Sequence, residues 1–149
     1  MWMDCILARE KITPELERVI NAVKKEWKMY PLSIVSVRNV LTKIGYNKHY
    51  KHAPLILKRV SGVGPPDIPD NILVRCKIIF SEVMKAYTFC FNSSNSAGYP
   101  YIIYKIFDAG CGFHEHRRIL DFIHVQSPRT IANLDKEWNT ILKYLVENH

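Results

Sequence analysis

The chain has 149 residues, of which 48% are hydrophobic and 23% are charged. This balance excludes an intrinsically disordered chain, and the length is that of one ordinary domain rather than two. Lys and Arg number 21 against 14 Asp and Glu, and the resulting net charge of +7 favours a polyanionic partner such as nucleic acid or an acidic protein surface.

The cysteines and the apolar runs indicate a reducing, intracellular compartment. Cys5, Cys76, Cys90 and Cys111 are widely spaced and no two form a C-x-x-C pair, so we expect no disulfide framework. The first residues lack the basic and apolar regions of a secretory signal, and no stretch reaches the length of a membrane span. We therefore expect no membrane partner.

The first third of the chain carries two helix signals. Thr13 followed by Pro14 predicts a helix start, and the apolar residues after it recur at helical spacing. That stripe consists of Leu16, Val19, Ile20, Val23 and Trp27, and we interpret the opposite face, with Glu17, Arg18, Lys24, Lys25 and Lys28, as solvated. Pro31 closes this segment, Ser36 is predicted to cap a second helix, and Gly45 fits the left-handed position after its end.

The middle of the chain predicts helices on both sides of a linker. Residues 47–60 fit two helical turns interrupted near Pro54. The Gly/Pro-rich residues 61–69 cannot continue a helix and form the clearest hinge. Residues 70–91 then predict a long central helix. Its expected buried side is made by Leu73, Cys76, the aliphatic part of Lys77, Phe80, Val83, Met84 and Tyr87.

Residues 99–107 are so apolar that a buried helix and a strand compete, and Pro100 favours the helix. The aromatic residues of this run, Tyr99, Tyr101, Tyr104 and Phe107, could form a stacking platform, but the core is the favoured place for them. Residues 115–125 are expected to be helical, with Ile119, Leu120, Phe122 and Ile123 inward.

Ser127-Pro128 repeats the helix-start signal and predicts a last helix to about residue 147. Its apolar face would consist of Ile131, Leu134, Trp138, Ile141, Leu142 and Leu145. The predicted fold is all-α, a single compact domain of about six or seven helices. Residues 1–35 would form an N-terminal helical extension and residues 36–149 the main helical domain.

The strongest sequence candidate for a metal site is Cys111 with His114 and His116. A fourth ligand is not evident, and histidines two residues apart on a helix point to different faces, so exposed histidines beside a glycine turn are the favoured interpretation. Asp108, Asp121 and Asp135 could meet as a catalytic cluster, but caps and ion pairs explain them more simply. We expect no metal, no cofactor and no enzymatic activity.

Three basic clusters are candidates for binding nucleic acid or a protein partner. Lys48 and Lys51 flank Tyr50, which could stack on a base while the lysines contact phosphates. Two basic pairs could join the same patch after folding, Lys58 with Arg59 and Arg117 with Arg118. The alternative is a surface whose cations are only solvated.

Several blocks of the sequence together resemble a known family. Residues 98–107, residues 118–126, Thr130 and residues 135–138 are similar, in order and spacing, to the poxvirus late transcription factor 3-like domain of large double-stranded DNA viruses. Residues 40–50 and 65–69 resemble its earlier blocks, so the resemblance covers about residues 36–149.

The resemblance implies a factor for transcribing viral late genes. Its implied partners are the viral RNA polymerase or other late transcription factors, together with double-stranded DNA. Its implied location is the viral factory in the host cytoplasm, the nucleus or the virion. Members often carry a cysteine-rich zinc segment before this domain, whereas here only Cys5 precedes it, so zinc does not carry over. The alternative function is a virion structural or assembly protein that uses the same helical domain for protein contacts.

Overall fold

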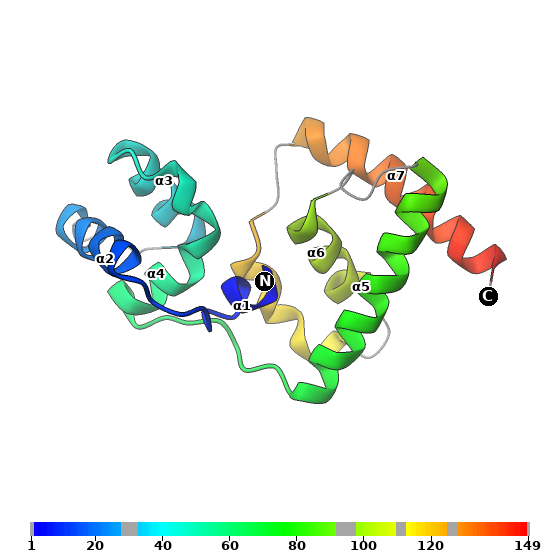
Figure 1. The fold of residues 1–149 in the computed structure, drawn as a ribbon, viewed down its shortest axis with the longest axis horizontal. Helices are drawn as coiled ribbons and strands as arrows, with labels where there is room; N and C mark the ends of the chain where they lie inside the picture. The colour runs from blue at the N-terminus through cyan, green and yellow to red at the C-terminus, as the bar shows by residue number, and fades with distance from the viewer. Residues whose placement is uncertain (1, 28–32, 92–97, 110–112, 125–127, 149) are drawn as a thin grey trace. The chain divides into compact units, whose positions relative to one another are not determined.

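Helices account for all regular secondary structure in the part of the chain that the structure describes (Figure 1). The computed structural model describes residues 2–27, 33–91, 98–109, 113–124 and 128–148. Seven α-helices and two 3-10 helices lie in these ranges: α1 (Trp2–Ile6), α2 (Pro14–Glu26), α3 (Ile34–Lys43), η1 (Asn47–His52), α4 (Ala53–Ser61), α5 (Asp70–Phe91), α6 (Tyr99–Ala109), η2 (His114–Phe122) and α7 (Pro128–Glu147). The predicted all-α class is confirmed.

Helix α2 begins where the sequence predicted. Thr13 adopts an extended backbone, and its hydroxyl accepts a hydrogen bond of 3.1 Å from the Leu16 amide, while Pro14 occupies the first turn. Leu16, Val19, Ile20 and Val23 are buried, as their spacing indicated. The prediction for Pro31 falls outside the described residues.

Helix α3 starts earlier than the sequence suggested. The capping residue is Ser33, whose hydroxyl accepts from the Ser36 amide at 3.2 Å, so the prediction of Ser36 as the cap was wrong. The earlier start places Ile34 in the helix and buries it. The other end is as predicted, because Gly45 has a φ of +84°, a conformation that L side chains rarely adopt.

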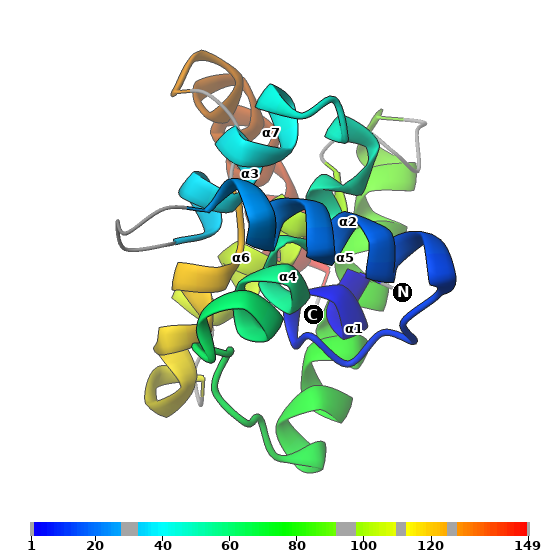
Figure 2. The same ribbon diagram turned by 90° about the vertical axis from the view of Figure 1, so that its left-hand side faces the viewer.

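The chain groups into two compact units, here called unit 1 (residues 1–67 and 118–124) and unit 2 (residues 68–117 and 125–149). In unit 1, α2 packs against α3 and α4, and α1 packs against α4 and η1 (Figure 2). The larger core side chains that are at most 1% exposed are Val19, Ile20, Val23, Val37, Leu41 and Ile56. Burying each such side chain contributes roughly 1.5–3 kcal/mol, so this packing fixes the helices of unit 1.

The Gly/Pro-rich segment does end a helix. Gly62, directly after α4, has a φ of +81°, and the first stretch of unit 1 ends within this segment at Asp67. Upstream, η1 gives way to α4 next to Pro54, in agreement with the predicted interruption. The proposed division of the chain after residue 35 stays a prediction, although this boundary falls within α3, which packs against α2.

Unit 2 is built on α5, which packs against α6 and α7. The predicted α6 is confirmed as a helix, and Tyr101 and Phe107 are buried in it while Tyr99 is exposed. On α5 the predicted core is correct for Cys76, Val83 and Tyr87. Ile72 and Ala86 are buried as well, whereas Leu73, Phe80 and Met84 are only half-buried.

Two predicted core positions in unit 2 were wrong. Lys77 is exposed, since it sits one residue beyond the buried Cys76 on the outer side of α5. Leu142 of α7 is 41% exposed, because the inward direction at that turn is occupied by Ile141. The rest of the α7 stripe is confirmed for Leu134, Trp138 and Ile141, which are buried, whereas Ile131 and Leu145 are only half-buried. The predicted start signal at Ser127 lies outside the described residues.

In the segment predicted as a helix over residues 115–125, the residues up to Phe122 belong to the 3-10 helix η2, which has non-helical backbone angles at His116, and residue 125 lies outside the described residues. Ile119, Phe122 and Ile123 are buried as predicted, but Leu120 is only half-buried. The kink shows why helical spacing alone did not determine the geometry here. A 3-10 turn repeats every three residues instead of 3.6, so inward positions shift along the segment.

A hydrogen bond joins α6 to α7 in unit 2. The Tyr101 hydroxyl donates to Oδ1 of Asp135 at 2.5 Å, and Lys105 lies 3.0 Å from the same oxygen. The Tyr101 bond and then Lys105 hold the pKa of Asp135 below its usual range. Burial, followed by the bond to Asp135, raises the pKa of Tyr101.

Replacing Asp135 with Asn should therefore destabilise the protein in a pH-dependent way. Because the folded-state pKa of Asp135 is lowered, its contribution is present above the unfolded pKa of about 3.9 and is lost as the pH falls through the folded value. We expect D135N to lower the free energy of unfolding by about 1 kcal/mol or less at pH 7, given the exposed carboxylate. Urea unfolding followed by circular dichroism should show this deficit shrinking as the pH is lowered from 7 to below about 3.9. A deficit of equal size at pH 7 and in acid would contradict the assignment.

Candidate nucleic-acid interface

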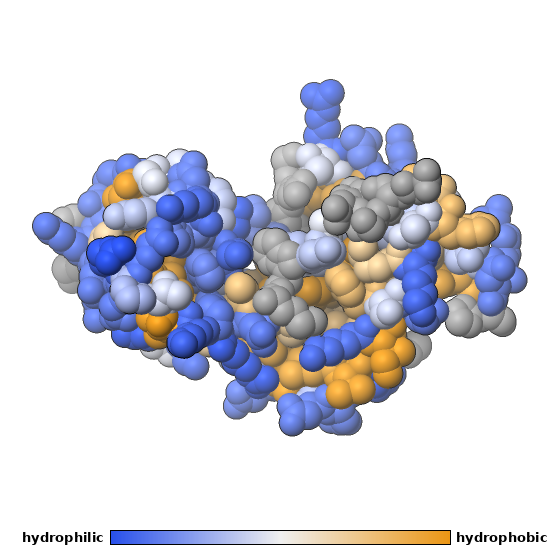
Figure 3. All heavy atoms as spheres, viewed as in Figure 1, coloured by the Kyte–Doolittle hydropathy of each residue, from blue (hydrophilic) through white to orange (hydrophobic). Residues whose placement is uncertain are grey.

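The net positive charge of the chain belongs almost entirely to one of the two units. Unit 1 contains 13 Lys and Arg against 7 Asp and Glu, a net charge of +6, whereas unit 2 contains 8 against 7, a net charge of +1. Hydrophilic residues cover most of the visible surface of α2, α3 and α4 (Figure 3). Composition alone did not reveal this asymmetry, because it depends on which segments fold together.

Lys48 and Lys51 are both exposed on η1. Lys48 forms an ion pair of 2.9 Å with Glu15 at the start of α2, and the same carboxylate oxygen lies 3.3 Å from Nε2 of the buried His49. The hydrogen bond from Lys48 is the main reason that the pKa of Glu15 is lowered. For Lys51 no ion pair is found within the described residues.

Lys58 and Arg59 are exposed in the last turn of α4. Arg59 pairs with Glu17 of α2 at 3.1 Å. Lys58 has no ion pair among the described residues, and its side-chain carbons pass beside Gly64, where a Cβ would come within 3.1 Å of Cδ. The structure therefore brings Lys48 and Arg59 to the same acidic end of α2. The other two cations of these basic clusters, Lys51 and Lys58, have no ion pair among the described residues.

The tyrosine between the η1 lysines does not present an open ring. The Arg38 guanidinium of α3 lies 4.1 Å from the centroid of the Tyr50 ring, and the Tyr50 hydroxyl is hydrogen-bonded to Thr42. Arg38 therefore covers one face of this half-buried ring. Stacking of Tyr50 on a base, as suggested by the sequence, stays a prediction that would have to use the other face.

The third basic pair is divided between the two units. Arg117 belongs to unit 2, where it binds Asp108 with an Nη2–Oδ1 distance of 2.8 Å. Arg118 belongs to unit 1 and is exposed. Five of the six predicted basic residues thus lie in unit 1, and their role as binding residues stays a prediction.

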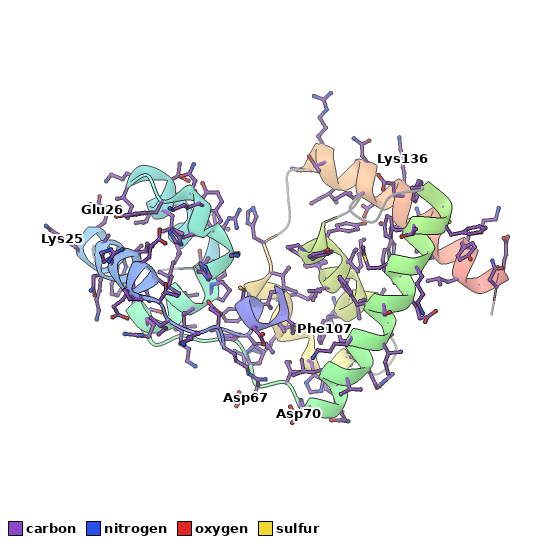
Figure 4. All side chains as sticks on the ribbon, viewed as in Figure 1. Lys25, Glu26, Asp67, Asp70, Phe107 and Lys136 are labelled. Atoms are coloured by element: carbon purple, nitrogen blue, oxygen red, sulfur yellow. The ribbon has the colours of Figure 1, made fainter. Side chains whose placement is uncertain are left out.

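Sequence interpretation passed over a further group of cations on α2. Arg18, Lys24 and Lys25 are exposed, and Lys25 extends outward from the helix (Figure 4). Arg18 and Lys25 are seven residues apart and so share one side of α2. The signal was visible in the sequence as the polar face of this helix, which we interpreted as merely solvated.

The sequence-based metal candidate and the cluster that the structure forms are different. Cys111 lies outside the described residues, His114 is exposed and His116 is half-buried. Instead, Cys5, Glu10 and His52 bring one possible ligand atom each to within 4.8 Å of one another. Hydrogen bonds to Cys5 and then Glu10 raise the pKa of His52 to about 9. Their wide separation in sequence left no motif that could have predicted this cluster.

Comparison with known proteins identifies the family. Residues 1–148 match the family described as "Poxvirus Late Transcription Factor VLTF3 like". The chain belongs to this family. The resemblance seen in the blocks of the sequence is therefore confirmed, and it extends beyond the expected residues 36–149 to include α1 and α2.

Two kinds of relative show how far this likeness reaches. The "Zinc finger protein B385R" of African swine fever virus is 36% identical over 140 residues, which are 91% of this chain and 36% of that protein. The "Putative transcription factor R429" of Acanthamoeba polyphaga mimivirus is 27% identical over 135 residues, 85% of this chain and 30% of that protein. The chain thus spans about a third of the length of these relatives. No solved structure matches it significantly.

None of the helices in the described residues combines the length and the apolar character needed to cross a bilayer.

Proposed function

We propose that this chain is a late-gene transcription factor domain of a large DNA virus, and that it docks to nucleic acid through the basic surface of unit 1. Membership of the late transcription factor 3-like family supports the role in late transcription. A transcription factor family also supports a binding function in preference to catalysis. The observation that carries the DNA-docking step is the concentration of the net charge, +6 of +7, in unit 1.

The proposed contact surface is centred on Lys48, Lys51, Lys58 and Arg59, with Arg118 of the same unit as a further contact. All five side chains are exposed. Exposed lysines and arginines bind phosphates without reading the base sequence, so this surface would supply affinity and not promoter specificity. Viral RNA polymerase or other late transcription factors would then be the partners that direct the domain to late genes. The host cytoplasm, as the site of a viral factory, the nucleus and the virion remain the proposed locations.

A specific observation also favours a protein partner for unit 2. Val74, Ile78 and Phe89 of α5 are 55%, 59% and 73% exposed, and apolar surface is visible along the lower half of α5 (Figure 3). Exposed apolar groups of this kind are common at protein–protein contacts. Docking to the transcription machinery would use such a face, and so would the alternative role in virion structure or assembly.

Binding of the full chain to labelled duplex DNA at two salt concentrations tests the proposal. We expect salt-sensitive binding, and we expect the variant K48A/K51A/K58A/R59A to bind much more weakly. Each phosphate contact removed should reduce the slope of log K against log salt by about 0.9. Circular dichroism should show an unchanged helix content, because exposed side chains contribute little to stability.

The matched control removes three lysines and one arginine from unit 2. K77A/R129A/K136A/K143A changes the net charge by the same amount at four exposed positions. If this control lowers affinity as much as the unit 1 variant, the attraction is general and not located in unit 1. If wild-type protein fails to bind DNA at low salt, the DNA-docking proposal is wrong and the protein-docking role takes its place.

Removing the acidic partners of the basic surface should have the opposite effect. Glu15 and Glu17 are paired with Lys48 and Arg59, so E15Q/E17Q would leave these cations available for phosphates. We expect DNA affinity to rise roughly 2- to 10-fold at low salt and the gain to shrink as salt is added. The variant E82Q/E147Q in unit 2 makes the same charge change away from this surface. An equal gain in both variants would count against a contact at η1 and α4.

A further inference from the structure

Three side chains able to bind a metal ion converge in unit 1, apart from the basic surface. Cys5 belongs to α1, Glu10 to the segment that follows it, and His52 is the last residue of η1. The Cys5 sulfur, a Glu10 carboxylate oxygen and a His52 ring nitrogen all lie within 4.8 Å of one another. Nδ1 of His52 is 3.3 Å from Oε1 of Glu10.

The backbone after α1 has an unusual turn that brings Glu10 back toward Cys5. Ala8 has a φ of +57°, and the Arg9 amide donates a hydrogen bond of 2.8 Å to the carbonyl of Asp4. A residue other than glycine in this conformation costs about 1 kcal/mol or more, and the surrounding structure must hold it there. The packing of α1 against η1 and α4 holds Ala8 in this conformation, and it places His52 beside the turn.

The cluster is buried and incompletely satisfied. Cys5 is 7% exposed, and the side chains of Glu10 and His52 are 10% and 18% exposed. Oε2 of Glu10 is buried and has no hydrogen-bond partner among the described residues. A buried carboxylate oxygen without a partner is costly, and a bound cation is one way to satisfy it.

The arrangement differs from a catalytic Cys–His–carboxylate triad. In a triad the imidazole stands between the other two groups and bonds each through a different ring nitrogen. Here the sulfur also lies within 4.8 Å of the carboxylate oxygen, so the ring does not hold these two groups apart. Donors around a tetrahedral zinc ion are roughly 3.4–3.6 Å apart, given the usual zinc–ligand bond lengths. Convergence on one point is what coordination requires.

We propose that Cys5, Glu10 and His52 form a zinc-binding site with a fourth position open to water or to a donor from a partner. Sulfur, imidazole and carboxylate ligands suit zinc better than magnesium or calcium, which prefer oxygen ligands. Binding releases two protons to solvent, one from the Cys5 thiol and one from the charged His52 imidazole, because the metal takes the thiolate and the neutral imidazole as ligands. The ion would join α1 to the junction of η1 and α4. This site revises the expectation, drawn from the sequence alone, that the chain binds no metal.

The test is titration of the metal-free full chain with Co²⁺, whose absorption spectrum reports tetrahedral geometry and thiolate ligation. We expect one equivalent to bind with a sulfur-to-cobalt charge-transfer band, and one equivalent of zinc to displace it. C5S should lose the band, and H52Q and E10Q should weaken binding by at least about tenfold, since losing even an outer partner of a ligand costs 10- to 100-fold. Zinc should raise the melting temperature of wild-type protein but not of C5S.

The control C90S removes a half-buried cysteine of α5 in unit 2 and should bind Co²⁺ as wild type does. Glu10→Gln keeps the shape of the side chain and decides the outcome if Cys5→Ser fails to fold. The proposal is overturned if wild-type protein binds no equivalent of either metal, if the charge-transfer band survives in C5S, or if E10Q retains full affinity.

Discussion

The buried apolar contact of α2 with α3 and α4 is the constraint on which the surface of unit 1 depends. Val19, Ile20 and Val23 on α2 are at most 1% exposed, and Leu41 of α3 and Ile56 of α4 are fully buried. Because these side chains fix which way each helix faces, the cations of η1 and α4 must lie on the outside. The same packing brings the acidic first turn of α2 next to them. The packing of α2 against α3 and α4 therefore both forms the core of unit 1 and sets the position of the candidate interface.

Two carboxylates neutralise part of the positive charge of this basic surface. Glu15 and Glu17 each engage one cation, which keeps part of the charge of unit 1 paired within the chain. Exposed ion pairs are weak and are screened by salt, so a phosphate can replace a carboxylate at little cost. Such a surface favours binding that is adjustable and not specific for sequence. Selection of late promoters would then depend on the partners that the domain meets.

The proposed zinc site and the proposed DNA surface share one element. His52 ends η1, the short helix that also carries Lys48 and Lys51. A 3-10 helix of this length has little stability of its own and depends on its neighbours. An ion held by Cys5, Glu10 and His52 would fix η1 against α1, and so would hold both lysines in place. The two proposals remain separately testable, since metal binding is measured without DNA.

Local signals predicted the helices well where one residue type has one physical role. Thr13 with Pro14, Gly45, and Pro100 within an apolar run each marked a boundary or a helix that the structure contains. Prediction failed where neighbours decide, as when Ser33 and not Ser36 caps α3.

The candidate site was predictable only in part, for the same physical reason. The basic pairs are visible in the sequence, but their ion pairs with α2 join residues more than 30 positions apart. The cluster of Cys5, Glu10 and His52 likewise depends on tertiary packing and on the turn at Ala8.

The central claim is that unit 1 contacts nucleic acid through η1 and α4. Its most direct test is an NMR titration of the isotope-labelled chain with a short DNA duplex at low salt, following backbone amide and lysine side-chain signals. We predict that shifts concentrate at residues 47–61 and along α2, and that they fade as salt is raised. Shifts confined to α5 and α7, or none at all, would contradict the account.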